Sequence, residues 1–110
     1  MAIAHARSGE LLDILPFAET FPLEQSIALV RSEHWEVFRL VLPEGKTVPE
    51  HKVNSVTLLQ CLEGSVDLTA HGTTQKMRPG HLVYLAAGVP HALKARNDAS
   101  VLVTMLVERE

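Results

Sequence analysis

Cysteine, aromatic residues and clustered basic residues are all scarce in this sequence. Cys61 is the only cysteine, so the chain can form no intrachain disulfide. Phe, Trp and Tyr together make up 5% of the residues, so we expect a core of aliphatic side chains. Lys and Arg are scattered singly along the chain, whereas nucleic-acid binding needs a clustered basic surface. The sequence therefore favours neither a disulfide scaffold nor a nucleic-acid partner.

Long hydrophobic runs are also missing. The longest apolar stretch, residues 101–107, is interrupted by Thr104 and is far too short to cross a bilayer. The first residues contain no continuous apolar run of the length that a signal peptide needs. We therefore expect a cytoplasmic protein without a membrane partner. The 110 residues, 46% hydrophobic and 21% charged, are typical of one folded domain over residues 1–110.

Short runs of β-forming residues, interrupted by turn residues about every ten positions, predict an all-β fold. We expect strands over residues 26–31, 35–42, 53–62, 65–70, 73–77, 82–85, 91–95 and 100–107. No segment has the 3.6-residue period of a long helix, and the pattern is typical of a β-sandwich or barrel. Residues 1–25 are the least patterned and form an N-terminal extension or an edge strand. Residues 11–15, which precede Pro16, could form an edge strand or one helical turn that the proline ends, and we favour the strand.

The six histidines invite a metal hypothesis and divide into two groups. Four lie in the N-terminal segment or beside turns, where a solvated histidine is the ordinary case: His5, His34, His71 and His81. The other two, His51 and His91, each lie within a few residues of a proline and a glycine, at the start of a predicted apolar strand. We expect these two strands to face each other across a barrel.

The spacing of glycine and histidine over residues 45–64 and 80–95 resembles the two motifs of the cupin family. These motifs are commonly written G-x5-H-x-H-x3-E-x6-G and G-x5-P-x-G-x2-H-x3-N. At the matching positions this chain has Gly45, His51, Val53, Thr57 and Gly64, and then Gly80, Ala86, Gly88, His91 and Ala95. The resemblance implies a small RmlC-like cupin, whose fold is the double-stranded β-helix or jelly-roll barrel.

The departures from these motifs bear on metal binding. In metal-binding cupins the ligands are two His and one Glu of the first motif and the His of the second. Carried over position by position, this chain supplies His51, Val53, Thr57 and His91, so the carboxylate is missing. Glu50 should point to the opposite face of the strand from its neighbour His51. Since a catalytic zinc usually has three protein ligands, we expect either no cofactor or a divalent metal weakly bound by His51 and His91.

The resemblance also implies a ligand cavity inside the barrel. By strand alternation we expect its lining to include His51, Val53, Thr57, Leu59, Cys61, His91, Leu93 and Ala95. Three functions stay open. The favoured one is binding of a small organic molecule without a tightly bound metal. A metal-dependent enzyme (dioxygenase, isomerase or decarboxylase) would use the weak His51/His91 site, and a metal-free, epimerase-like enzyme would use one of these histidines as its general base. Glu63 is interpreted as a turn or surface charge.

A homodimer is the expected assembly. A chain this short buries a modest fraction of its surface, and an exposed edge strand needs cover. The candidate pairing segments are the N-terminal residues 1–25 and the apolar residues 101–107.

Overall fold

The computed structural model describes residues 5–22 and 26–107, and over these residues it contains nine strands and one short 3-10 helix. The strands are β1 (Ile27–Arg31), β2 (Trp35–Leu42), β3 (Thr47–His51), β4 (Thr57–Glu63), β5 (Val66–Ala70), β6 (Thr73–Met77), β7 (Leu82–Leu85), β8 (His91–Ala95) and β9 (Ala99–Leu106). The helix is η1 (Ala18–Thr20). The all-β, jelly-roll prediction is confirmed. No helix in the described part of the chain is long and apolar enough to span a membrane.

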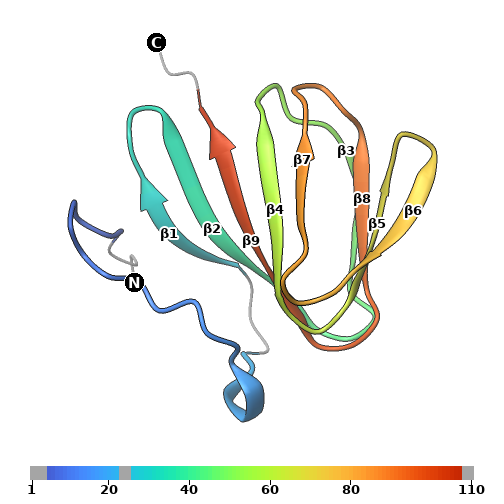
Figure 1. The fold of residues 1–110 in the computed structure, drawn as a ribbon, viewed down its shortest axis with the longest axis horizontal. Coiled ribbons are helices and arrows are strands. Elements are labelled where there is room, and N and C mark those ends of the chain that lie inside the picture. The colour runs from blue at the N-terminus through green and yellow to red at the C-terminus, as the bar shows by residue number, and fades with distance from the viewer. Residues whose placement is uncertain (1–4, 23–25, 108–110) are drawn as a thin grey trace.

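The strands form two antiparallel sheets that enclose the core (Figure 1). The larger sheet has the order β1-β2-β9-β4-β7, and the smaller has the order β3-β8-β5-β6. Strand β9 lies between β2 and β4 and pairs with both along most of its length. Strand β9 therefore has no free edge for strand pairing with a second subunit, and contact of residues 101–107 with a second subunit through the face of the sheet stays a prediction.

The structure departs from the predicted strands by more than one residue in two places. Residues 47–51 form β3, although Pro49 and the charged Glu50 gave no strand signal in the sequence. The strand predicted over 53–62 begins only at Thr57, and residues 52–56 form a connection between the two sheets. That connection is held by the Gly88 N–H, which donates to the Val53 carbonyl at 2.8 Å.

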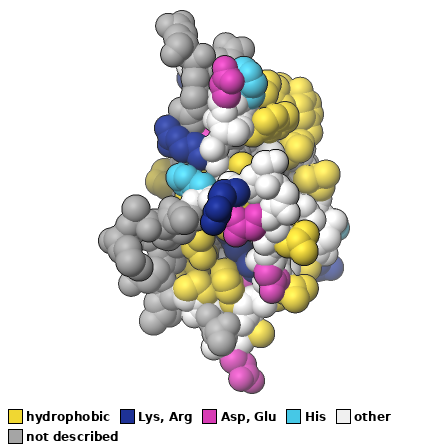
Figure 2. Space-filling model, turned by 90° about the vertical axis from the view of Figure 1, so that its left-hand side faces the viewer, with side chains coloured by type: hydrophobic (Ala, Val, Ile, Leu, Met, Phe, Trp, Pro, Cys, Tyr) yellow, Lys and Arg dark blue, Asp and Glu magenta, His cyan; other side chains and the backbone are white. Residues whose placement is uncertain are grey.

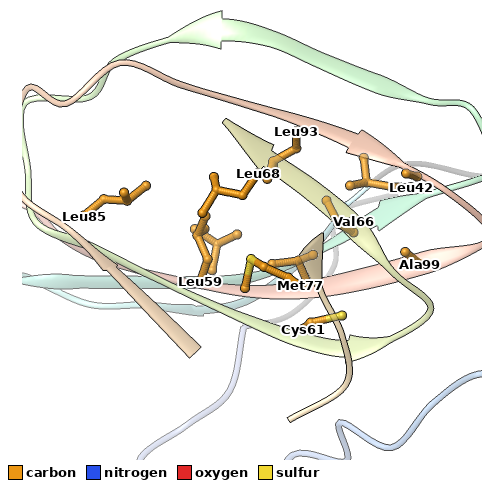
Figure 3. Close-up of a cluster of buried hydrophobic side chains, with 12 residues drawn as sticks. Leu42, Leu59, Cys61, Val66, Leu68, Met77, Leu85, Leu93 and Ala99 are labelled. Carbon is orange, nitrogen blue, oxygen red and sulfur yellow. The ribbon is translucent and has the colours of Figure 1, made fainter. Parts of the chain in front are cut away.

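The core lies between the two sheets and is aliphatic, as expected from the scarcity of aromatic residues (Figure 3). Its buried members come from strands of both sheets and include Leu42, Leu59, Val66, Leu68, Leu93 and Val101. Gly64 lies against the backbone of Asp98 and Ala99, and Ala99 is a member of this core. A Cβ placed there would approach the Asp98 carbonyl oxygen to 2.2 Å, and its φ of +71° favours glycine. Only glycine fits this position without displacing the backbone of residues 98–99.

The N-terminal segment does not form the edge strand that was predicted. Residues 10–17 have no regular structure and lead into η1, while residues 1–4 and 23–25 of the predicted segment lie outside the described residues. The segment is instead held by a buried polar cluster of Arg39, Glu63 and Ser100. The Arg39 guanidinium donates from Nη2 to the Leu15 carbonyl at 2.7 Å and to Glu63 Oε1 at 3.2 Å.

Glu63 is therefore not the surface charge that its place at a strand end predicted. Its carboxylate accepts hydrogen bonds from the backbone N–H of Phe17 and Ala18 and from the Ser100 hydroxyl. The Arg39 side chain is 4% exposed and the Glu63 side chain 12% exposed. The guanidinium also lies over the Phe17 ring, 3.7 Å from its centroid. Burial lowers the pKa of Arg39, and the neighbouring Glu63 carboxylate opposes that shift.

The face seen from the left-hand side of Figure 1 mixes charges of both signs with hydrophobic side chains (Figure 2). Lys and Arg side chains there lie next to Asp and Glu, so this face presents no continuous basic patch.

Candidate functional site

The two histidines singled out from the sequence are direct neighbours in the smaller sheet. His51 is the last residue of β3, His91 is the first residue of β8, and the two residues are partners in the antiparallel ladder. Their ring centroids lie 4.4 Å apart with an interplanar angle of 54°. The expectation that their strands face each other across the barrel is wrong: the strands lie side by side, which brings the two rings into contact.

Each imidazole is held by a backbone carbonyl two residues earlier in the chain. His51 Nδ1 lies 3.1 Å from the Pro49 carbonyl oxygen, and His91 Nδ1 lies 3.0 Å from the Val89 carbonyl oxygen. Since a carbonyl oxygen can only accept, Nδ1 carries the proton in both contacts and donates it. In the neutral ring Nε2 is then the nitrogen with a free lone pair. The same local geometry therefore orients both rings and leaves both Nε2 atoms as acceptors.

A cavity of about 110 Å³ adjoins this pair. Its walls come from both sheets and are mostly aliphatic: Phe38, Leu40, Val48, His51, Val53, Thr57, Leu59, His91, Leu93, Val103 and Met105. His91 is 4% exposed, His51 is exposed, and both side chains line this cavity. The site is a small, mostly apolar cavity whose polar lining residues are His51, His91 and Thr57.

Six of the eight residues predicted to line the cavity do so. The prediction placed His51, Val53 and Thr57 along one strand, whereas the structure divides them between two strands and a connection. Thr57 was assigned to the strand of His51, but it lies in β4 of the opposite sheet, and Val53 lies in the connection between β3 and β4. The structure thus places Thr57 in the wall of the same cavity as the histidines, from the opposite sheet. Its hydroxyl donates to the Ser55 carbonyl at 3.3 Å, so its oxygen can still accept a hydrogen bond in the cavity.

Cys61 and Ala95 do not line this cavity. Each is 1% exposed and belongs to the buried core further along the barrel, where Figure 3 labels Cys61 among aliphatic side chains. Burial raises the pKa of the Cys61 thiol, which keeps it protonated and unreactive near neutral pH.

Five lining residues were missed by the sequence reasoning: Phe38, Leu40, Val48, Val103 and Met105. Alternation along residues 35–42 and 100–107 places apolar side chains on one face, but it does not say which end of the barrel each one reaches.

The residues present do not fit a tightly held metal ion. The positions that would supply two further ligands in the resembling motif hold Val53, which is apolar, and Thr57, a neutral hydroxyl. The described residues contain no group of three or more His, Cys, Asp or Glu side chains that could hold a metal ion. Glu50 is exposed and lines a different cavity with His71, in agreement with its predicted orientation away from the histidine pair. Two imidazoles alone fall short of the three protein ligands of a catalytic zinc.

Within residues 5–22 and 26–107, no carboxylate is hydrogen-bonded to either histidine. Both Nδ1 atoms bond to backbone carbonyls, and the cavity lining contains no Asp or Glu. A general-base histidine is usually oriented by an acidic group that stabilises its charged form. The arrangement therefore gives the metal-free acid–base alternative no specific support.

Comparison with known proteins places this geometry in a family. The model of the cupin domain family matches residues 38–107, which run from β2 to the end of β9. No curated protein matches the chain.

Three solved structures with the same fold cover between 77% and 100% of the chain. A cupin superfamily protein from Desulfitobacterium hafniense aligns with a TM-score of 0.78 and 22% identity, over 94% of this chain and 100% of its own. A conserved protein from Streptococcus pyogenes aligns with a TM-score of 0.74 and 21% identity, over 100% and 99% of the two chains. The DMSP lyase DddQ from Ruegeria pomeroyi aligns with a TM-score of 0.71 and 20% identity, over 77% of this chain and 47% of that one. At these identities the likeness shows a shared fold.

Proposed function

The chain belongs to the cupin domain family, and from that premise we propose that its barrel binds a small organic molecule at the His51/His91 pair without a tightly bound metal. The observation that carries this proposal is the orientation of the two imidazoles. Their Nδ1–H groups donate to the backbone, so both Nε2 lone pairs are available beside an otherwise aliphatic cavity. Because cupins of one fold differ in activity, the proposal rests on this site rather than on the fold.

The cavity limits the size of the ligand. Its volume of about 110 Å³ is below the roughly 300 Å³ at which pockets for drug-sized molecules begin. We therefore expect a compound with few non-hydrogen atoms, or one that inserts only its end.

The polar lining residues limit the chemistry of the ligand. In the neutral state the two Nε2 atoms and the Thr57 oxygen are acceptors, so the matching ligand carries hydroxyl or N–H donors next to an aliphatic portion. An isolated ionic group is disfavoured, because the lining holds no Asp, Glu, Lys or Arg to compensate it. A small alcohol or diol fits both conditions.

A screen by nuclear magnetic resonance tests the proposal. The full chain, labelled on the methyl groups of Leu, Val and Met, is titrated with small alcohols and diols, and the methyl signals of Val53, Leu59 and Val103 are followed. We expect saturable shifts at these methyls that are lost in His51→Ala and in His91→Ala. The control is His34→Ala, which removes a histidine with a 66% exposed side chain outside the cavity and should leave the shifts intact. Binding that persists in both cavity variants would overturn the proposal, as would the absence of shifts from every compound.

A further inference from the structure

Two strands of the barrel have an edge with which no other strand pairs. Strand β7 ends the larger sheet on the side opposite β1, and β6 ends the smaller sheet (Figure 1). Within the described residues, β7 pairs with β4 alone and β6 pairs with β5 alone, so each strand keeps one row of backbone hydrogen-bonding groups free. Native proteins usually cover such edges, because they are ready to pair with another chain.

The free edge of β7 is formed by the backbone of Leu82 and Tyr84. The Cys61 N–H of β4 donates to the His81 carbonyl at 3.0 Å. Backbone groups of successive residues in an antiparallel ladder point to opposite edges, so Val83 directs its N–H and C=O towards β4, whereas Leu82 and Tyr84 direct theirs away from it. These two residues are 62% and 61% exposed. Strand β7 therefore presents unpaired backbone groups together with exposed apolar side chains.

A groove with an apolar floor, here called the β6–β7 groove, lies beside this edge. It consists of two cavities of about 220 and 280 Å³, which share Leu68, Gln75 and Val83 in their linings. Met77 lines only the first cavity and Leu85 only the second, and both residues are buried. Val83 and Leu85 are two positions apart on the inner face of β7. The two cavities therefore follow one another along the strand, at the spacing of alternate side chains.

Each end of the groove has a histidine, and the described lining contains no Asp or Glu. His81 lines the first cavity and His71 the second. The Arg78 N–H donates to His81 Nδ1 at 2.9 Å, so Nε2 of the His81 ring carries the proton and is a donor. Lys76 also lines the first cavity, but it lies opposite Asp67 in the ladder, whose carboxylate compensates its charge. The histidines therefore suit a ligand with acidic groups near its two ends.

We propose that the β6–β7 groove binds an extended peptide segment of another protein, which pairs with the free edge of β7 as an added strand. Apolar side chains at alternate positions of the peptide fill the two cavities, and acidic side chains on either flank reach His71 and His81. An extended backbone satisfies a row of unpaired N–H and C=O groups, and its alternation directs every second side chain into the groove. The site does not involve the His51/His91 cavity and stands independently of the proposed small-molecule ligand.

Titration with a synthetic peptide, followed by nuclear magnetic resonance, tests this site. The probe is a short capped peptide in which valine alternates with threonine and a glutamate stands at each end. We expect saturable shifts of the amide signals of Leu82 and Tyr84 and of the methyl signals of Val83 and Leu85. A peptide of the same composition with its valines adjacent should bind more weakly, because only one of them can enter the groove.

Methylation of the peptide backbone tests the strand pairing. The alternating peptide is methylated on every second amide nitrogen, in both possible registers. Only one of these two sets of N–H groups faces β7, so methylation of one set should abolish binding and methylation of the other should be tolerated.

The variant Gln75→Phe fills the groove from the side of β6. Gln75 is exposed and lines both cavities, so the larger side chain should occupy them and leave the barrel folded. Peptide binding should weaken about tenfold or more, because the burial of an apolar side chain is lost. Thr74→Phe is the matched control on the next residue of β6. The Thr74 side chain points to the other face, where its hydroxyl lies 2.8 Å from Thr69 Oγ1, and this variant should bind the peptide like the native chain.

Four results would overturn the proposal. The first is no binding of the alternating peptide, and the second is equal binding of the peptide with adjacent valines. The third is tolerance of methylation in both registers, because the groove would then take apolar groups without strand pairing. The fourth comes from sedimentation velocity of the chain without peptide: self-association that Gln75→Phe abolishes and Thr74→Phe preserves would show that a second copy of the chain occupies the groove. Equal losses of peptide binding in Gln75→Phe and Thr74→Phe would likewise contradict the proposal, because the peptide would then lie outside the groove.

Discussion

Replacing Glu63 with alanine removes the acceptor that holds the N-terminal segment on the barrel. The Glu63 carboxylate accepts hydrogen bonds from Arg39 Nη2, the Ser100 hydroxyl, and the backbone N–H groups of Phe17 and Ala18. Without it, Arg39 keeps its charge in a site where its side chain is 4% exposed. Removing one partner of a buried ion pair costs about 3–5 kcal/mol, because the remaining charge is left uncompensated. We expect Glu63→Ala to lower the free energy of unfolding by that amount and Tm by roughly 10–20 °C.

The matched control is Arg31→Ala, which breaks an exposed ion pair of nearly the same length. Arg31 Nη1 lies 3.3 Å from Glu36 Oε1, compared with 3.2 Å for Arg39 and Glu63, but the side chains are 55% and 27% exposed. Exposed pairs contribute about 0–1 kcal/mol, so this variant should unfold almost like the native chain. Urea denaturation measures both losses, and amide hydrogen exchange at Phe17 and Ala18 should accelerate only in Glu63→Ala.

A double variant separates the cost of an unpaired charge from the cost of lost contacts. Arg39→Met with Glu63→Leu removes both charges together, so it should be more stable than Glu63→Ala alone. A loss of unfolding free energy in Glu63→Ala no larger than that in Arg31→Ala would contradict an uncompensated buried charge on Arg39. So would a double variant whose loss equals the sum of the losses of Arg39→Met and Glu63→Leu measured singly.

Two further outcomes follow from the structure. Gly64→Ala should destabilise the chain by more than about 2 kcal/mol in urea denaturation, because left-handed strain of roughly 1–2 kcal/mol is joined by a clash with Asp98. Gly45→Ala, with a φ of +84° and nothing within 4 Å of the added Cβ, should show the strain alone, and equal losses would contradict the clash. Burial raises the pKa of the Cys61 thiol above its ordinary value of 9.0, so the folded chain holds this proton more tightly than the unfolded chain. This contribution to stability is complete below that ordinary pKa and is lost as the pH rises towards the folded value. Native stability should fall above about pH 9, and Cys61→Ala should reduce that fall in denaturation measured against pH.

Most of the fold could be predicted from local patterns in the sequence. Glycine, proline and polar turn residues punctuate the chain regularly, and strands such as β2 and β6 begin and end where those signals place them. Strand β3 was missed because Pro49 and Glu50 are poor strand residues, and its pairing with β8 is a contact between segments far apart in the sequence. Periodicity carries no information about such a partner.

The sequence identified the two central residues of the candidate site but not how they are placed relative to each other. The motif resemblance singled out His51 and His91, whereas their side-by-side placement depends on the β3–β8 register. The role of Glu63 was mistaken because its partner Arg39 lies 24 residues earlier and alternates with the inward-facing Phe38 and Leu40. The sequence signal for this pair was Arg39 itself, because a charged side chain within an apolar strand needs an opposite charge or hydrogen-bond acceptors beside it.

The proposed role of the His51/His91 pair is to bind a small organic ligand without holding a metal tightly. Its most direct test is the metal content of the full chain, purified without chelator or affinity tag, beside His51→Ala and His91→Ala. We expect nickel, zinc, iron and manganese well below one equivalent in the native chain and the same content in both variants. A metal bound near one equivalent that both variants abolish would contradict the account and would identify the pair as a metal centre.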